Sequence, residues 1–416
     1  MSLSLEPQNP IPSPMSSSSR WLTVVALIVA GASATFFIAS KRRPQRWPDP
    51  VRTATAMGDS TCLSCHTDKA SYEGTAHHLT TRFPTRASIV GSFKTGENEL
   101  HTPNAALHFR MTADSNGFYE TAITGTGKDT TTRTERIAYV AGSGRKGQSF
   151  LYWAGDQLYQ LPVSYWMSIG KWINSPGPAY IDGKANFDRA VAPRCLECHA
   201  TYMEQIPDLR LVNRYKPGTA TLGITCERCH GAGQEHVNNE RSVLHAMKQV
   251  AIVNPARLSR ARKMEACGQC HGGLGQPKVP SFSYVAGQRL DDYLRLADNT
   301  DEATVDVHGN QVALLSRSKC FRNSQMTCIT CHNVHAPQRD VKVLSGKCMD
   351  CHQEQSCGLF KTQGHAIAGK CVDCHMPLQQ SNLIVSAIEG KQEQALVRTH
   401  WIKVYQDSLR RGKPGS

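Results

Sequence analysis

The sequence predicts a fold made mostly of short α-helices and loops, with a small β-rich segment and one N-terminal transmembrane helix. Three observations predict it. The motif Cys-x-x-Cys-His occurs seven times, six of the seven copies fall within 181 residues, and one stretch near the N-terminus is twenty residues long and uncharged. Because this motif attaches a c-type haem, we expect stacked haems, rather than layered secondary structure, to fill much of the interior.

Every Cys-x-x-Cys pair in the chain is followed directly by a histidine. Two cysteine thiols form thioethers with the porphyrin, and the adjacent imidazole ligates the iron. Zinc is the alternative, but at a structural zinc site thiolate pairs combine in twos, and seven is an odd number. We therefore predict a multihaem cytochrome c fold with seven covalently attached haems c. The attaching cysteines are Cys62, Cys65, Cys195, Cys198, Cys226, Cys229, Cys267, Cys270, Cys328, Cys331, Cys348, Cys351, Cys371 and Cys374, and the iron-ligating histidines are His66, His199, His230, His271, His332, His352 and His375.

The N-terminal part of the chain is expected to lie outside the folded domain. Residues 1–20 are rich in proline and serine and are expected to be disordered. Residues 21–40 are long enough to cross a bilayer, either as a signal anchor or as a signal peptide. The apolar run continues past a small-residue cleavage signal, which favours an anchor. Residues 41–57 are expected to form a linker.

The predicted location is the periplasmic face of the cytoplasmic membrane, or the periplasm if the N-terminal segment is cleaved. Positive charge is concentrated on the C-terminal side of the segment, at Lys41, Arg42, Arg43 and Arg46, and this favours the opposite orientation. We give more weight to haem attachment, which takes place outside the cytoplasmic membrane, because long domains translocate largely regardless of flanking charge.

The folded region begins with residues 58–194, which carry the first motif and a β-rich segment. Short alternating apolar runs predict strands over 118–123 and 136–140. Residues 149–152 and 157–161 predict a hairpin whose turn lies at positions 155 and 156.

The remaining chain divides into a six-haem region, residues 195–378, and a C-terminal tail, residues 379–416. The six-haem region offers about 30 residues for each motif, too few to surround each porphyrin with layered secondary structure. The tail contains apolar residues and is expected to pack back on the haem domain. Two cysteines outside the motifs, Cys320 and Cys357, are expected to form a disulfide in an oxidising compartment, with two free thiols as the alternative.

The formal net charge of +13 does not indicate a nucleic-acid partner. Each haem brings two propionates, so seven haems offset this charge almost completely. We expect the basic residues to neutralise the cofactors, and we predict no nucleic-acid binding.

Outside the motifs the chain has ten further histidines, a surplus that suits a second axial imidazole on each iron. From about Thr61 to Ile402 the chain resembles the bacterial multihaem c-type cytochromes with repeated Cys-x-x-Cys-His motifs, the group that includes the tetrahaem partner of hydroxylamine oxidoreductase. The segments that carry the resemblance are 62–66 with 75–77, 142–149, 225–236, 307–310, 328–335, 371–377 and 398–402.

The resemblance implies that histidines at such positions are distal iron ligands, typically of a haem other than the one in the nearest motif. The histidines carried over are His77, His236, His308, His335, His365 and His400. The distal ligand of the seventh haem stays open. A methionine in this position would raise the reduction potential of its haem. The candidates are His78, His101, His108, His245, Met326 and Met376.

The predicted function is that of a membrane-anchored, extracytoplasmic heptahaem c-type cytochrome that passes single electrons between a redox protein donor and an acceptor. Its other predicted partner is the inner membrane. One alternative is a multihaem oxidoreductase that acts on a small nitrogen or sulfur compound at a haem with an open axial position. Another is a subunit of a larger complex. No catalytic residue is assigned, and the uniform motifs favour an electron carrier over an enzyme.

Overall fold

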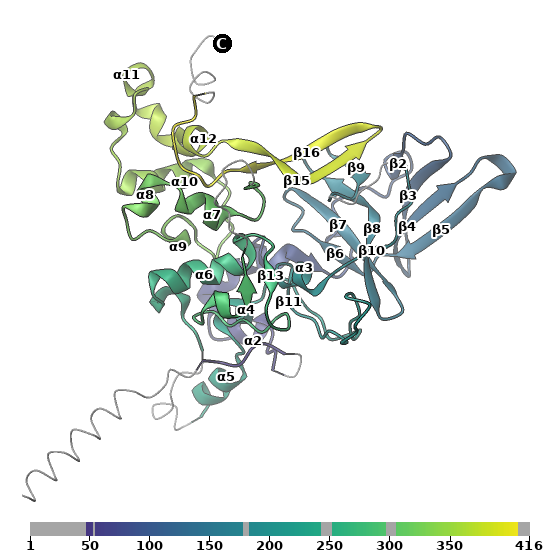
Figure 1. Ribbon diagram of the computed structural model, residues 1–416, viewed down its shortest axis with the longest axis horizontal. Coiled ribbons are helices and arrows are strands. Elements are labelled where there is room, and N and C mark those ends of the chain that lie inside the picture. The colour runs from purple at the N-terminus through teal and green to yellow at the C-terminus, as the bar shows by residue number, and fades with distance from the viewer. Residues whose placement is uncertain (1–46, 53–54, 178–182, 243–251, 297–304, 407–416) are drawn as a thin grey trace, which may run out of the picture. The chain divides into compact units, whose positions relative to one another are not determined.

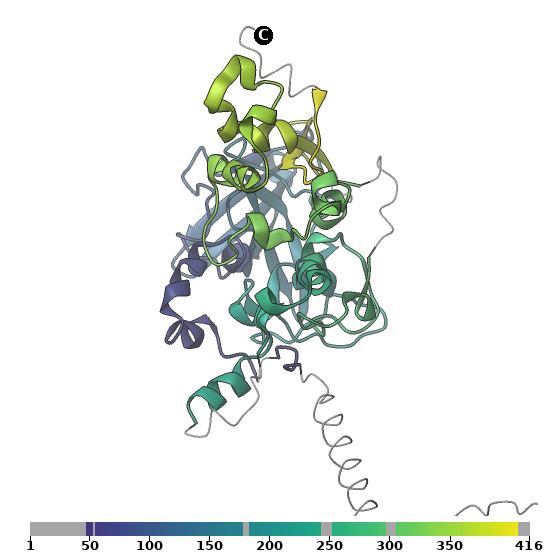
Figure 2. The same ribbon diagram turned by 90° about the vertical axis from the view of Figure 1, so that its left-hand side faces the viewer.

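The computed structural model describes residues 47–52, 55–177, 183–242, 252–296 and 305–406, which belong to one compact unit. The unit contains antiparallel β-sheets and a series of short helices that carry the motifs (Figures 1 and 2). In the described part of the chain, 82 residues lie in strands and 63 in α-helices.

The strands form two larger antiparallel sheets and three two-stranded sheets. The six-stranded sheet has the order β1-β6-β7-β8-β10, with β9 paired to β8, and the four-stranded sheet has the order β2-β3-β4-β5. The strands are β1 (Thr81–Arg82), β2 (Glu99–His101), β3 (Leu107–Asp114), β4 (Gly117–Thr124), β5 (Thr131–Arg136), β6 (Tyr139–Ala141), β7 (Gly147–Ala154), β8 (Gln157–Trp166), β9 (Lys171–Asn174), β10 (Arg189–Ala190), β11 (Ala200–Tyr202), β12 (Thr221–Leu222), β13 (Gln276–Pro277), β14 (Leu294–Arg295), β15 (Leu378–Ile388) and β16 (Lys391–Arg398).

The hairpin predicted from the sequence is confirmed. Strands β7 and β8 pair antiparallel, and their turn includes Gly155, which has a φ of 64° that favours glycine. The strand predicted over 118–123 is confirmed as part of β4, and the run 136–140 covers the end of β5 and the start of β6.

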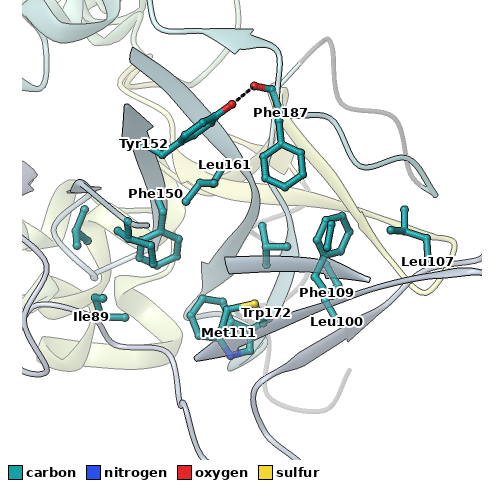
Figure 3. Packing of buried hydrophobic residues seen from close by; sticks show 14 residues of the cluster. Ile89, Leu100, Leu107, Phe109, Met111, Phe150, Tyr152, Leu161, Trp172 and Phe187 are labelled. Atoms are coloured by element: carbon teal, nitrogen blue, oxygen red, sulfur yellow. Dashed lines mark hydrogen bonds between the residues drawn. The ribbon is translucent and has the colours of Figure 1, made fainter. Parts of the chain in front are cut away.

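The two larger sheets share a core of aromatic and aliphatic side chains (Figure 3). Phe109 and Met111 of β3 are fully buried, and they belong to the same cluster as Phe150 of β7 and Leu161 of β8. Such residues alternate along β3 with more exposed ones, as a half-buried strand requires. Each buried side chain of this size contributes about 1.5–3 kcal/mol. This part of the chain therefore has a core that is built from its own side chains.

Glu120 is a carboxyl group buried inside this core. One of its oxygens accepts a hydrogen bond from the Val163 backbone N–H at 2.9 Å, and the other has no hydrogen-bond partner among the described residues. Burial raises the pKa of Glu120 well above its ordinary value, so the side chain is neutral in the folded protein. Protonated Glu120 contributes stability that is fully present when the pH is below the pKa of this carboxyl in the unfolded chain. This contribution is lost as the pH rises through the pKa of Glu120 in the folded protein.

Replacing Glu120 by Gln is expected to raise the free energy of unfolding at pH 7.5 and to change it little at pH 4.5. Gln keeps the acceptor for Val163 and needs no proton, whereas the cost of keeping Glu120 protonated grows by about 1.4 kcal/mol for each pH unit above its unfolded pKa. Urea unfolding followed by far-UV circular dichroism at both pH values tests this, with the exposed Glu97→Gln as the control. A difference that is the same at both pH values would contradict the expectation.

The helices are short, and each motif lies on or next to one of them. The α-helices are α2 (Asp59–Leu63), α3 (Pro193–Glu197), α4 (Cys226–His230), α5 (Gln234–Glu240), α6 (Arg260–His271), α7 (Gln311–Ser316), α8 (Lys319–Arg322), α9 (Cys328–Cys331), α10 (Val341–Gly346), α11 (Phe360–Gln363) and α12 (Cys371–His375). The 3-10 helices are η1 (Thr67–Gly74), η2 (His78–Thr80), η3 (Gly127–Asp129), η5 (Pro255–Arg257), η6 (Leu290–Asp292), η7 (Lys347–Asp350), η8 (Glu354–Ser356) and η9 (Gly364–Lys370).

The C-terminal tail contacts both the sheets and the motif helices. It forms the β15–β16 hairpin, in which the carbonyl of Ala387 accepts a hydrogen bond from Asn174 of β9. Arg398 at the end of β16 donates to the carbonyls of Val372 and Met376, next to the last motif. The hairpin therefore links the sheets to the region around α12.

Two predictions about the fold are wrong. The sheets are not a small segment, because strands account for more of the described chain than α-helices do. The transmembrane helix predicted over 21–40 lies outside the described residues, and no helix in the described ranges is long and apolar enough to cross a bilayer. The structure thus gives no support to a membrane anchor or to a location that depends on one.

Residues 1–20 and the first part of the predicted linker also lie outside the described residues. The described end of that linker belongs to the folded unit, since Val51 is buried and the Met57 backbone N–H donates to Glu227 of α4 at 3.0 Å. Cys320 and Cys357 are both free thiols, so the expected disulfide is not formed.

Candidate haem-binding site

The seven motifs line one continuous cavity. Its volume is about 3380 Å³, and all fourteen motif cysteines and all seven motif histidines contribute to its lining. Divided among seven motifs, this volume gives about 480 Å³ for each, within the range of about 300–1,000 Å³ typical of pockets for organic ligands. Cavity size and donor set therefore fit a group of covalently held porphyrins.

The charge of the lining also fits this group. The cavity is lined by thirteen lysine and arginine side chains and by four aspartate and glutamate side chains. This excess of positive charge suits the propionates that each haem carries. The basic composition of the chain is therefore concentrated where acidic cofactors would lie.

Cysteines of different motifs lie next to one another within this cavity. Four pairs of thiols lie close enough to shift each other's pKa, and the pairs are Cys62 with Cys226, Cys198 with Cys270, Cys267 with Cys328, and Cys348 with Cys371. Because each cysteine would bond to the edge of a porphyrin, paired cysteines would place two porphyrin edges side by side.

Four motif histidines each face a histidine from outside the motifs. An imidazole nitrogen bonds a metal at about 2.0 Å, so two imidazoles on opposite faces of one iron have ring centres about 6.2 Å apart. The observed separations are 6.4 Å for His66 and His236, 6.0 Å for His271 and His77, 6.1 Å for His230 and His335, and 6.2 Å for His332 and His400. The four pairs are therefore spaced as bis-histidine ligands would be.

Burial favours the neutral form of several of these imidazoles, which iron ligation requires. Burial lowers the pKa of His77 to about 4 and that of His400 to about 4. Desolvation also lowers the pKa of His230, His271 and His332. The ring nitrogens of these histidines are therefore available as ligands at neutral pH.

Hydrogen bonds from the other ring nitrogen orient some of the motif histidines. Nδ1 of His230 donates to the Val253 carbonyl at 2.7 Å, and Nδ1 of His375 donates to the Lys403 carbonyl at 3.0 Å. This leaves Nε2 as the ligand atom, an arrangement common among metal-binding histidines. Sequence reasoning missed Val253 and Lys403, because a backbone carbonyl acceptor has no side-chain signature.

The other predicted distal ligands are placed differently. His308 lines the cavity and lies close to His199. Burial lowers the pKa of His199, and the charge of His308 lowers that pKa further. His365 does not line the cavity; its side chain is 83% exposed and is hydrogen-bonded to Glu354. The structure therefore brings five of the six named distal candidates to the cavity and leaves His365 at the surface.

Among the candidates for the seventh position, Met326 and Met376 line the cavity. His78 is paired with Asp59 at 2.9 Å, and neither it nor the neighbouring rings of His101 and His108, on β2 and β3, line the cavity. His245 lies outside the described residues.

Comparison with known proteins gives one family match and several distant relatives. The family model for cytochrome c554 and c-prime matches residues 178–231, which include the second and third motifs. The C-type polyheme cytochrome OmcC of Geobacter sulfurreducens is 22% identical over 173 residues, or 35% of this chain and 21% of the relative. OmcB of the same species is 23% identical over 176 residues, or 36% of this chain and 21% of the relative. No solved structure matches the chain.

The motifs, the cavity and these matches together support a multihaem c-type cytochrome with covalently bound haem c. The chain matches only about a fifth of the length of these relatives. The family match likewise covers a short stretch, so the particular tetrahaem family suggested by the sequence is not shown.

Proposed function

We propose that this protein is an electron carrier in which seven covalently attached haems relay single electrons between redox protein partners. One observation carries the proposal, namely that all seven motifs line a single cavity in which thiols of different motifs lie close enough to shift each other's pKa. Electron tunnelling falls steeply with the distance between cofactor edges, and adjacent porphyrin edges are therefore what a relay needs. The protein tunes each haem through axial ligands, burial and hydrogen bonds.

The cysteine contacts suggest an order for the relay. The haems on the first and third motifs are neighbours, as are those on the second and fourth, the fourth and fifth, and the sixth and seventh. Electrostatic interaction of Cys331 with Cys348 also links the fifth and sixth motifs, and that of Cys229 with Cys267 links the third and fourth. In this order, the haem held by Cys267 and Cys270 has neighbours on more than one side.

A second candidate function is supported by two motif histidines. Among the described residues, His199, His352 and His375 make no ring contact with a second histidine, but His308 lies near His199. A haem held by His352 or His375 would then have an axial position open for a small nitrogen or sulfur compound. An oxidoreductase would use the haem of the sixth or seventh motif.

Low-temperature EPR of the fully oxidised, haem-quantified protein separates the two functions. A relay of bis-ligated haems is expected to give low-spin signals that account for all the iron. A stoichiometric high-spin signal that shifts on adding nitrite or hydroxylamine would contradict a pure relay and favour the oxidoreductase.

A further inference from the structure

Three residues meet in the interior, and each of them lies between the two cysteines of its own motif. Glu197 belongs to the second motif, Arg228 to the third and Gln269 to the fourth, and they lie on α3, α4 and α6. All three are buried, with 8%, 6% and 4% of their surface exposed. Haem attachment and iron ligation do not use these side chains, so their burial together needs another explanation.

Hydrogen bonds through these residues tie the three helices together. Arg194, at the start of α3, pairs with Glu197 at 3.2 Å and donates to the Gln269 carbonyl of α6. Arg228 of α4 donates to the Glu197 carbonyl at 3.3 Å, and the Phe282 backbone N–H donates to the Glu197 carboxylate at 2.6 Å. This network fixes the second, third and fourth motifs relative to one another.

Three buried polar atoms of this cluster have no hydrogen-bond partner among the described residues. They are Nε of Arg228, Oε1 of Gln269 and the hydroxyl of Tyr284, and all three residues line a cavity of about 10 Å³. A cavity of about 10–15 Å³ is the smallest that holds one water molecule. The Gln269 amide nitrogen donates to the Ala266 carbonyl at 3.0 Å, which leaves Oε1 as the amide atom without a partner.

The hydrogen-bonding pattern of the cavity selects its occupant. Arg228 and Tyr284 present donors, and Gln269 presents an acceptor. Water accepts from the first two and donates to the third, whereas a bare cation or anion satisfies one kind of partner only. A buried polar atom without a partner is destabilising, so a single bound water satisfies three such atoms at once.

The same cluster carries an uncompensated positive charge. Arg194 is neutralised by Glu197, but Arg228 has no carboxylate within ion-pair distance among the described residues and packs over the Phe282 ring at 5.7 Å. The Arg228 guanidinium and the Cys270 thiol both donate to the Glu197 carbonyl, at 3.3 and 3.7 Å, directly before Cys198 in the chain. A haem loses one positive charge on reduction, and a nearby fixed cation therefore favours its reduced form.

We propose that this pocket binds one fixed water molecule, and that Arg228, oriented by that water, raises the reduction potentials of the haems attached at the second, third and fourth motifs. Arg228 acts on these three haems through its charge. The inference rests on the proposed function, because it requires haems at these motifs.

Spectroelectrochemical titration of the haem-loaded full chain tests the electrostatic part. Arg228→Gln is expected to shift three of the seven potentials downward, and Arg228→Lys is expected to keep them near the wild-type values. The exposed Arg210→Gln is the control for loss of one positive charge. If Arg228→Gln binds seven haems and all seven potentials are unchanged, the inference is overturned, while the proposed relay function still stands. Fewer than seven haems in the wild-type protein would instead count against the relay.

Tyr284→Phe gives an independent test should Arg228→Gln fail to load haem. A high-resolution structure of the haem-loaded wild type is expected to show one water within hydrogen-bonding distance of Arg228 Nε, Gln269 Oε1 and the Tyr284 hydroxyl. A structure of Tyr284→Phe determined in the same way is expected to show weaker density for that water, or none. A pocket without a water in the wild type, or with a different occupant, would overturn the binding claim.

Discussion

A full-length chain produced without haem attachment is expected to be cut rapidly by protease across residues 195–378, while the strands from β3 to β8 resist. The motif region encloses a cavity of about 3380 Å³, so the porphyrins supply contacts that the short helices cannot make with one another. The sheets, in contrast, bury Phe109, Phe150 and Leu161 in a core of their own. Loss of the cofactor should therefore unfold one part of the chain preferentially.

Limited trypsin digestion followed by mass spectrometry measures this difference. The haem-loaded protein is the matched control, and it is expected to resist cleavage in both parts. Equal resistance of the six-haem region with and without haem would contradict the view that porphyrins form its core. Cleavage spread evenly over the sheets and the motif helices would contradict the independent core of the sheets.

Replacing His400 by Met is expected to raise the potential of one haem by on the order of 0.1 V or more, within the roughly 0.8 V range that axial ligands span. His400 is buried, its pKa is lowered to about 4 by burial, and its ring lies 6.2 Å from that of His332. A methionine ligand stabilises the reduced iron relative to a second imidazole. Potentiometric titration with optical detection would resolve the shift.

His365→Met supplies the matched control for this prediction. The sequence indicates the same role for His365 as for His400, but the His365 side chain is exposed and does not line the cavity. His365→Met is therefore expected to leave every potential unchanged. If His365→Met shifts a haem potential and His400→Met shifts none, the iron ligands are not the histidine pairs described for the cavity.

The motif residues could be identified from the sequence because covalent haem attachment needs a fixed local spacing. Distal ligands follow no such spacing. His400 pairs with His332 across 68 positions, and His77 with His271 across 194, so their partners depend on tertiary structure. The family resemblance implies a ligand role for His365 as well, but the path of the chain between η8 and α12 leaves its ring at the surface.

The extent of the sheets was also hidden in the sequence. The predicted strands were those with a clear alternation of apolar residues, such as β4 and β8. Strand β5 is polar and almost wholly exposed, and it is held by backbone pairing with β4 rather than by burial. Strand β15 has an irregular register between Gln380 and Val385, which breaks the alternation along its length.

Peptide mapping of the purified protein by mass spectrometry tests the central claim most directly. After proteolysis, haem is expected to be attached to both cysteines of each motif, giving seven haem-bearing peptides, while Cys320 and Cys357 carry none. Unmodified cysteines at one or more motifs in protein from a haem-competent host would contradict a seven-haem relay within one cavity.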